Sequence, residues 1–208
     1  MQLSEFLLKN DINFTEQQIN QVFLYIDLLI KWNKVYNLTN IKKKEDILAR
    51  HIFESLEIIK HIKNNKLYKI IDVGTGAGVP GIILAIAMPE IQFFLCDIND
   101  KKLTFLRQAI IELKLTNALL VDQKIENYTP GFYFDIIISK AFSSLESFLI
   151  KTQHLGDKTS LFVTFKAKKD NNLTSSPVPS FLIDAIINQQ VEQNDYTRKL
   201  ILLKKKTI

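Results

Sequence analysis

The stretch DVGTGAGVPG, residues 72–81, contains four of the six glycines in the chain. It follows a short apolar run at 68–73 and leads into a helical pattern of apolar residues at 80–88. A glycine-rich turn between a strand and a helix lets a nucleotide-like ligand approach the backbone, because no side chains stand in the way. The stretch therefore predicts an α/β fold with a ligand site at the carboxyl end of a strand.

The chain beyond this turn alternates short apolar runs with helical stretches, which is typical of strand–helix units in a mostly parallel sheet. The predicted strands lie at 68–73, 92–97, 118–122, 134–139, 160–166, 182–187 and 198–203, and the predicted helices at 80–88, 100–114 and 144–154. KKDNNLTSSPVPS is expected to be a polar loop. The connection NQQVEQNDYT is too short for a helical crossover, so the last two strands should form an antiparallel hairpin at the sheet edge. The predicted fold is a Rossmann-like, seven-stranded, mostly parallel sheet with this C-terminal hairpin.

The residues before the sheet predict helices. Thr15 and Gln18 have capping-box spacing, and apolar residues of helical period follow as far as about 33. A second helix is predicted at 45–62, and the segment KWNKVYNLTN between the two predicts a turn. We therefore expect an N-terminal helical extension at 1–65 and an α/β domain at 66–208 that forms one compact unit.

The composition indicates a soluble protein. Of its 208 residues 47% are hydrophobic, and no apolar run approaches the ~18 residues that a membrane span needs. The N-terminus lacks the pattern of a secretory signal, and the single cysteine, Cys96, permits no internal disulfide. We expect a cytoplasmic monomer with no membrane partner. The formal net charge of +5 either attracts nucleic-acid phosphate or reflects lysines on a solvated face, and charge alone leaves both interpretations open.

The charge beside the glycine turn bears on which ligand the turn binds. Asp72 stands just before Gly74, and its carboxylate would repel a pyrophosphate but attract an ammonium or sulfonium group. The turn also contains the dinucleotide pattern GxGxxG as Gly76, Gly78 and Gly81, so a nicotinamide-dependent oxidoreductase is an alternative. The carboxylate favours a cationic ligand.

Acidic and apolar residues follow the next two predicted strands at the same edge. Asp97 ends the second strand, where doubly wound nucleotide folds place an acid on a ribose diol. Its alternative role is to cap the helix that begins near Asp100. After the third strand, Ile125 and Glu126 could offer an adenine ring an apolar contact and a polar edge, or simply fill a loop.

These features resemble the class I S-adenosylmethionine-dependent methyltransferases. More narrowly, KWNKVYNLTNI, RHIFESL, IDVGTGAGVPGI, FLRQ with ELKL, and FDIIISKAFSSL are similar to the small-subunit rRNA guanine-N7 methyltransferase G family, also called glucose-inhibited division protein B. The resemblance runs from about residue 15 to the final strand. It implies S-adenosylmethionine as cofactor and one guanine in the decoding-region loop of 16S rRNA as target, within free rRNA, an assembly intermediate or the small ribosomal subunit.

The resemblance also implies roles for particular residues. Cofactor contacts are implied at Gly74, Val79, Ile125, Glu126 and Lys140. The glycine turn and the acid after the second predicted strand add Asp72, Gly76, Gly78 and Asp97 as expected cofactor-binding residues. Asn37 is implied at the reacting site, with Lys124 and Lys166 as further positioning residues. Lys140 and Lys124 stand where the family usually has arginine, so a point charge replaces a two-pronged contact. The lysines expected to engage RNA phosphate are Lys124, Lys140, Lys166, Lys168 and Lys169.

The residues also limit which acceptor atom can be methylated. Methyltransferases that act on exocyclic amines usually hold the amine with an Asn/Asp-Pro-Pro-aromatic segment after the fourth strand, where this chain has SKAF. Methylation of a pyrimidine carbon needs a thiolate nucleophile, and the only cysteine, Cys96, is expected to be a core residue. Guanine N7 needs neither feature, because it presents a lone pair and carries no proton to remove. Alignment and preorganised dipoles should then suffice, without a dedicated general base.

Other residues have two interpretations. His51 lies beside Phe53 and Leu56 on a predicted helix, which indicates a buried histidine. The resemblance instead implies a role for His51 at the rim of the RNA or cofactor site. Phe142 is expected in the core, with stacking on a base as the alternative. No histidine has metal-ligand spacing with a cysteine, so no metal is predicted. A non-catalytic RNA-binding protein is a third possible function.

Overall fold

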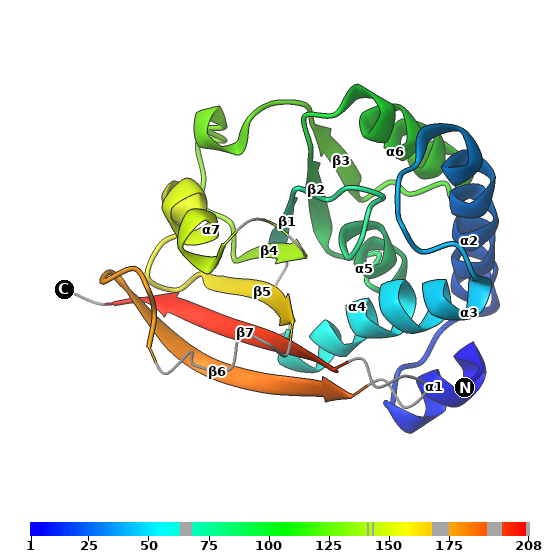
Figure 1. Ribbon diagram of the computed structural model, residues 1–208, viewed down its shortest axis with the longest axis horizontal. Coiled ribbons are helices and arrows are strands. Elements are labelled where there is room, and N and C mark those ends of the chain that lie inside the picture. The colour runs from blue at the N-terminus through cyan, green and yellow to red at the C-terminus, as the bar shows by residue number, and fades with distance from the viewer. Residues whose placement is uncertain (63–67, 141, 143, 168–174, 191–196, 207–208) are drawn as a thin grey trace.

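The computed structural model describes residues 1–62, 68–140, 142, 144–167, 175–190 and 197–206. A seven-stranded sheet of order β3-β2-β1-β4-β5-β7-β6 forms its centre (Figure 1). The strands are β1 Lys69–Val73, β2 Gln92–Cys96, β3 Ala118–Val121, β4 Ile136–Lys140, β5 Leu161–Ala167, β6 Phe181–Gln190 and β7 Thr197–Lys205. This confirms the predicted fold, with strand ends shifted by at most three residues.

Strand direction also follows the prediction. The pairs among β1 to β5 are parallel, and β7 lies antiparallel between β5 and β6. Because β6 and β7 are longer than expected, their connection shrinks to 191–196, which lies outside the described residues, as does the 168–174 part of the predicted polar loop. A β-bulge between Ile183 and Ala185 interrupts the register of the hairpin.

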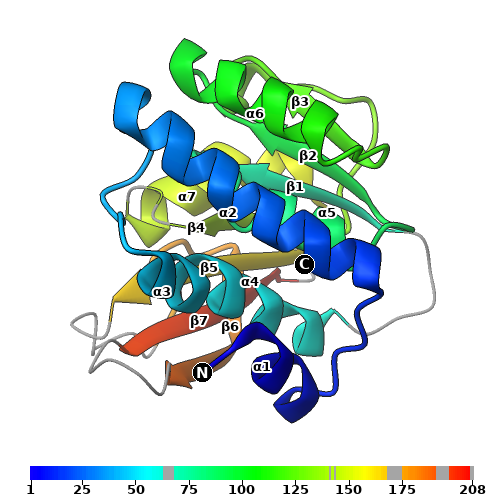
Figure 2. The same ribbon diagram turned by 90° about the vertical axis from the view of Figure 1, so that its right-hand side faces the viewer.

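Apolar side chains alternate along the strands and supply a core on each face of the sheet. Ile70 of β1 faces a core shared with α2 Glu16–Tyr36, α5 Gly81–Ala87 and α6 Asp100–Glu112. Its neighbour Ile71 faces the opposite core, which is shared with α7 Leu145–Thr152. The helices therefore cover both faces, as a parallel sheet requires (Figures 1 and 2).

The N-terminal helices pack on the sheet through the first of these cores. The expected single helix at 45–62 is a succession of short turns, namely α3 Lys44–Ile47, a π-helical turn Leu48–Phe53, α4 Glu54–Leu56 and a 3₁₀ turn Glu57–His61. A further helix that the sequence reasoning missed, α1 Leu3–Lys9, packs Phe6 on Phe53 with ring centroids 4.2 Å apart. None of the described helices is long and apolar enough to span a membrane.

The prediction of a turn throughout KWNKVYNLTN was wrong. Helix α2 continues to Tyr36, because Trp32 and Tyr36 lie one turn apart and stack with centroids 5.4 Å apart. The chain turns only at Asn37, which has φ of +50°. Asn33 fixes the turn by donating to the Thr39 carbonyl at 2.9 Å and accepting from the Thr39 N–H at 2.9 Å.

Candidate functional site

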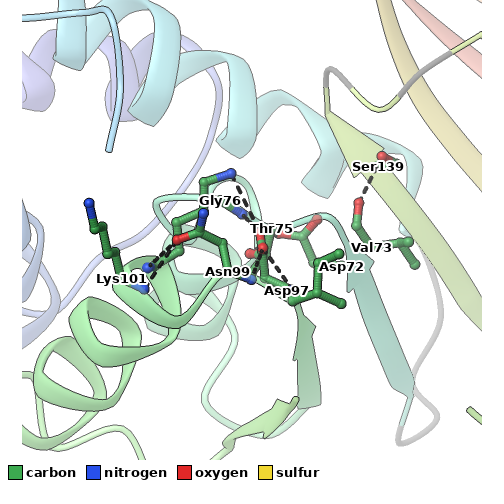
Figure 3. A network of polar contacts seen from close by, with 10 residues as sticks. Asp72, Val73, Thr75, Gly76, Asp97, Asn99, Lys101 and Ser139 are labelled. Atoms are coloured by element: carbon green, nitrogen blue, oxygen red, sulfur yellow. Dashed lines mark hydrogen bonds and ion pairs between the residues drawn. The ribbon is translucent and has the colours of Figure 1, made fainter. Parts of the chain in front are cut away.

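The glycine turn is folded around the carboxylate of Asp72, at the end of β1 (Figure 3). Its Oδ2 accepts from Thr75 Oγ1 at 2.6 Å and from the Gly81 N–H at 2.8 Å, which ties the strand to the start of α5. Gly81 must lack a side chain, since a Cβ there would lie 2.2 Å from Leu95 Cδ2. Asp72 is fully buried, and this burial raises the pKa of its carboxyl to about 6 against the lowering effect of the two hydrogen bonds.

The N–H groups of the turn are largely used within the protein. Those of Gly74 and Thr75 donate to the Cys96 carbonyl at 2.9 and 3.0 Å, and that of Gly78 donates to the Thr75 carbonyl at 2.9 Å. Gly74, Gly76 and Gly78 have φ of +70°, +61° and +85°, a region that favours glycine. The turn therefore offers a ligand close approach to bare backbone, while these donors are not available to bind a pyrophosphate.

Asp97 joins the end of β2 to the glycine turn. Its Oδ2 accepts from the Gly76 N–H at 2.9 Å and lies 3.7 Å from Lys102 Nζ. Its Oδ1 accepts from the next two N–H groups along the chain. The alternative role as helix cap was wrong, because Asn99 caps α6 through its own side chain (Figure 3).

A cavity of about 600 Å³, open mouth included, lies at the carboxyl ends of β1, β2 and β3. It is lined by Val73, Gly74, Cys96, Asp97, Ile98, Gln123, Lys124, Ile125, Glu126, Phe142 and Lys151. Five of the predicted site residues are among these, namely Gly74, Asp97, Lys124, Ile125 and Glu126. The seven others lie outside the lining, namely Asn37, Asp72, Gly76, Gly78, Val79, Lys140 and Lys166.

The walls of the cavity combine apolar and charged groups. One wall includes Ile98, whose residue surface is 60% exposed. Another wall includes Glu126, which forms a 2.6 Å ion pair with Lys151 of α7. The hydrogen bond from Lys151 is the main cause that lowers the pKa of the Glu126 carboxyl. Phe142 stands so close to the turn that a Cβ on Gly74 would lie 3.0 Å from its ring, so the residue forms part of the cavity wall.

Several of these lining residues were not predicted from the sequence. Ile98 had a usable signal, because it directly follows Asp97, the acid that comes after β2. Lys151 had none, because it reaches the cavity from α7, whose position depends on tertiary packing. Phe142 was predicted to be a core residue; it is partly buried against the core that includes α7 and also lines the cavity. Cys96 also lines the cavity, and burial, followed by the nearby Asp97, raises the pKa of its thiol to about 12, which keeps it protonated.

Lys140 faces away from the cavity, toward the N-terminal helices. Its Nζ lies 2.9 Å from Glu54 Oε2 of α4 and donates to the Arg50 carbonyl, and Arg198 Nε lies 3.6 Å from the same carboxylate. Burial lowers the pKa of Lys140 to about 8, although Glu54 opposes the shift. The residue thus fastens the helical extension to the end of β4.

The remaining predicted positions lie apart from the cavity or outside the described residues. Asn37 lines a second cavity of about 600 Å³ between α2 and α3, together with Lys34 and Lys42. Lys166 is half-buried on β5, opposite Lys199 of β7, and 168–169 are not described.

His51 is a buried histidine, in agreement with the first of its two interpretations. Its Nε2 lies 3.2 Å from Thr39 Oγ1, and only 9% of the residue is exposed. Burial, helped by the charge of Lys140, lowers the pKa of the imidazole to about 3, so the ring is neutral near pH 7. Across the described residues, no cluster of three or more His, Cys, Asp or Glu side chains could hold a metal ion.

The strand order, the glycine turn after β1 and the acid after β2 together define the class I methyltransferase fold. An S-adenosylmethionine-dependent methyltransferase from Aquifex aeolicus has the same fold, with a TM-score of 0.58 at 16% identity over 84% of this chain and 97% of that one. A ribosomal protein L11 methylase from Lactobacillus delbrueckii subsp. bulgaricus gives a TM-score of 0.56 at 15% identity over 76% and 79%.

The particular family follows from the sequence comparisons. The family described as GidB, rRNA small subunit methyltransferase G, matches residues 18–201, and the chain belongs to it. A ribosomal RNA small subunit methyltransferase G from Haemophilus ducreyi is 40% identical over 204 residues, 98% of each chain. One from Shewanella woodyi is 37% identical over 205 residues, 99% of this chain and 98% of the relative. Membership of this family favours a methyltransferase over the nicotinamide-dependent alternative.

Proposed function

We propose that this chain methylates N7 of one guanine in the decoding-region loop of 16S rRNA, with S-adenosylmethionine as the methyl donor. The observation that carries the proposal is the cavity at the ends of β1 to β3. Its lining includes the bare backbone of Gly74 and the carboxylate of Asp97. The relatives of this chain are named rRNA methyltransferases.

The residues present fit S-adenosylmethionine. Asp97 Oδ2 accepts one hydrogen bond, from the Gly76 N–H, so a lone pair is left for a ribose hydroxyl. Ile98 and Ile125 supply apolar walls for an adenine ring, and Gly74 allows the backbone to be approached closely. The carboxylate of Asp72 beneath the turn favours a cationic donor over a pyrophosphate. When bound, the cofactor supplies an electrophilic methyl group on a sulfonium.

The described lining of the cavity favours an acceptor that needs no deprotonation. The Cys96 thiol stays protonated near pH 7, and the Glu126 carboxylate is held by Lys151. At the end of β4, where amine methyltransferases hold their substrate, Ser139 is fully buried and donates to the Val73 carbonyl at 2.9 Å. Guanine N7 needs only alignment, because its in-plane lone pair carries no proton. These residues would therefore orient the reactants and exclude water.

The RNA partner would be held through its phosphates. Lys124 is exposed at the cavity and is placed to contact the backbone of a bound loop. We further propose that the protein acts as a cytoplasmic monomer, and that its substrate is 16S rRNA, either free or within the small subunit or an assembly intermediate.

Two binding measurements and one transfer measurement test the proposal. Calorimetric titration should show binding of S-adenosylhomocysteine and none of NADH, and the reverse result would restore the oxidoreductase alternative. Tritium from labelled S-adenosylmethionine should then pass into small-subunit rRNA. Cofactor binding without any transfer to rRNA or to particles would instead favour the non-catalytic RNA-binding protein.

A further inference from the structure

Helix α2 lies across the methyltransferase fold and passes diagonally over it between α6 and the short helices α3 and α4 (Figure 2). Three of its side chains donate to backbone carbonyls of the α/β part of the chain. Gln18 donates to Ile86 at the end of α5 at 2.8 Å, and Gln21 donates to Leu113 at the end of α6 at 2.6 Å. The third is Tyr25, which lies on the same face because it is one turn further along.

Tyr25 differs from the two glutamines in where its acceptor lies. Its hydroxyl donates to the carbonyl of Ala77 at 2.8 Å, in the middle of the glycine turn. The side chain is fully buried and packs beside Phe105, so its hydroxyl has no access to water as an alternative partner. Burial, followed by the charge of Asp72, raises the pKa of Tyr25 far above its usual value, so the hydroxyl remains a donor.

Ala77 sits between two residues that can adopt many backbone conformations. Gly76 and Gly78 both have positive φ, and a glycine pair allows the intervening peptide groups to rotate. The N–H of Gly76 is the group that binds Asp97, at 2.9 Å, so rotation near Ala77 would disturb the acid proposed for the ribose. The hydrogen bond from Tyr25 opposes that rotation.

We propose that Tyr25 is a positioning residue for the cofactor turn: from the N-terminal helical extension, its hydroxyl fixes the backbone of the turn and so sets the affinity for S-adenosylmethionine. The inference rests on the proposed function. It makes α2 part of the cofactor site although no residue of α2 lines the cavity at the carboxyl ends of β1, β2 and β3.

The test replaces Tyr25 by Phe, which keeps the ring and removes the hydroxyl. Gln21→Ala is the matched control, because it also removes a donor from α2 to a backbone carbonyl, but at the end of α6. We expect Tyr25→Phe to weaken binding of S-adenosylhomocysteine about fivefold, the effect of losing one buried hydrogen bond. Gln21→Ala should change the affinity less than about twofold, although both variants unfold more readily. KM should rise for the cofactor and not for rRNA.

Unchanged affinity in Tyr25→Phe, or an equal loss in Gln21→Ala, would overturn the inference while leaving the proposed function standing. Failure of the unsubstituted protein to bind S-adenosylhomocysteine would overturn both. A second measurement needs no variant: adding S-adenosylhomocysteine should slow amide hydrogen exchange in α2 around Tyr25 more than at 16–20. Equal protection, or none, along α2 would contradict the link between helix and turn.

Discussion

Substituting Gly74 by Ala tests whether the bare backbone of the glycine turn forms the cofactor site. Gly74 has φ of +70°, and a Cβ there would lie 3.0 Å from the Phe142 ring. Gly131 has φ of +74° with nothing within 4 Å of its Cβ position, so Gly131→Ala brings the same backbone strain without the contact. That strain costs about 1 kcal/mol in each variant. In Gly74→Ala the Phe142 ring must also move by a few tenths of an ångström, and this ring lines the cavity.

We expect both variants to lose about 1 kcal/mol of unfolding free energy in urea titrations. Only Gly74→Ala should lose affinity for S-adenosylhomocysteine, by about tenfold or roughly 1.4 kcal/mol, because only there does the new methyl group alter the cavity. Isothermal titration calorimetry at one temperature measures both affinities. If Gly74→Ala bound S-adenosylhomocysteine as tightly as Gly131→Ala, or if both weakened binding equally, the bare backbone at Gly74 would not form part of the cofactor site.

Four further outcomes are expected. Asp72→Asn keeps an acceptor for Thr75 and Gly81 but removes the charge, so it should weaken binding of the sulfonium S-adenosylmethionine about tenfold with little change in the unfolding midpoint; unchanged affinity would contradict this. The pKa of His51 in the folded protein, about 3, lies below its value of about 6.5 in the unfolded chain. The neutral ring therefore contributes fully to the free energy of unfolding above about pH 6.5, and this contribution is lost as pH falls toward 3. Stability in urea should therefore rise by at most about 1.4 kcal/mol per pH unit across that window, and His51→Gln should flatten the slope. Affinity for 16S rRNA should fall at least tenfold between about 50 and 200 mM salt, and insensitivity to salt would show that the lysines only solubilise the protein. Cys96 should react with a thiol reagent only on unfolding, and rapid reaction of the folded protein would count against its buried, protonated state.

The α/β core could be predicted because its strands and helices carry unbroken local patterns. Asp97 was correctly expected at the carboxyl ends of the parallel strands, because it lies at the end of a strand that the sequence predicts. The end of α2 was not predictable from the asparagines in KWNKVYNLTN, because stacking of Trp32 on Tyr36 overrides the turn tendency of that segment. Helix α1 was missed because a helix this short acquires stability by packing its apolar face in the core, where Phe6 stacks on Phe53.

The site was predicted less completely than the fold. Local patterns indicated a glycine turn but not that its N–H groups bond to Cys96 and Asp97, which depends on tertiary geometry. The environment of Lys140 depends on Glu54, far away in the sequence, so no local signal placed its ammonium on that carboxylate. The contact of Tyr25 with Ala77 likewise joins two segments whose patterns are independent of one another.

The position of the methyl group that the purified protein adds to RNA would decide whether guanine N7 is the acceptor. Small-subunit rRNA from cells that lack the protein is incubated with it and S-adenosylmethionine, digested, and mapped by mass spectrometry. We expect one new 7-methylguanosine, in the decoding-region loop of 16S rRNA. Methylation of a ribose, an exocyclic amine or a pyrimidine carbon, or the absence of any new methyl group, would contradict it.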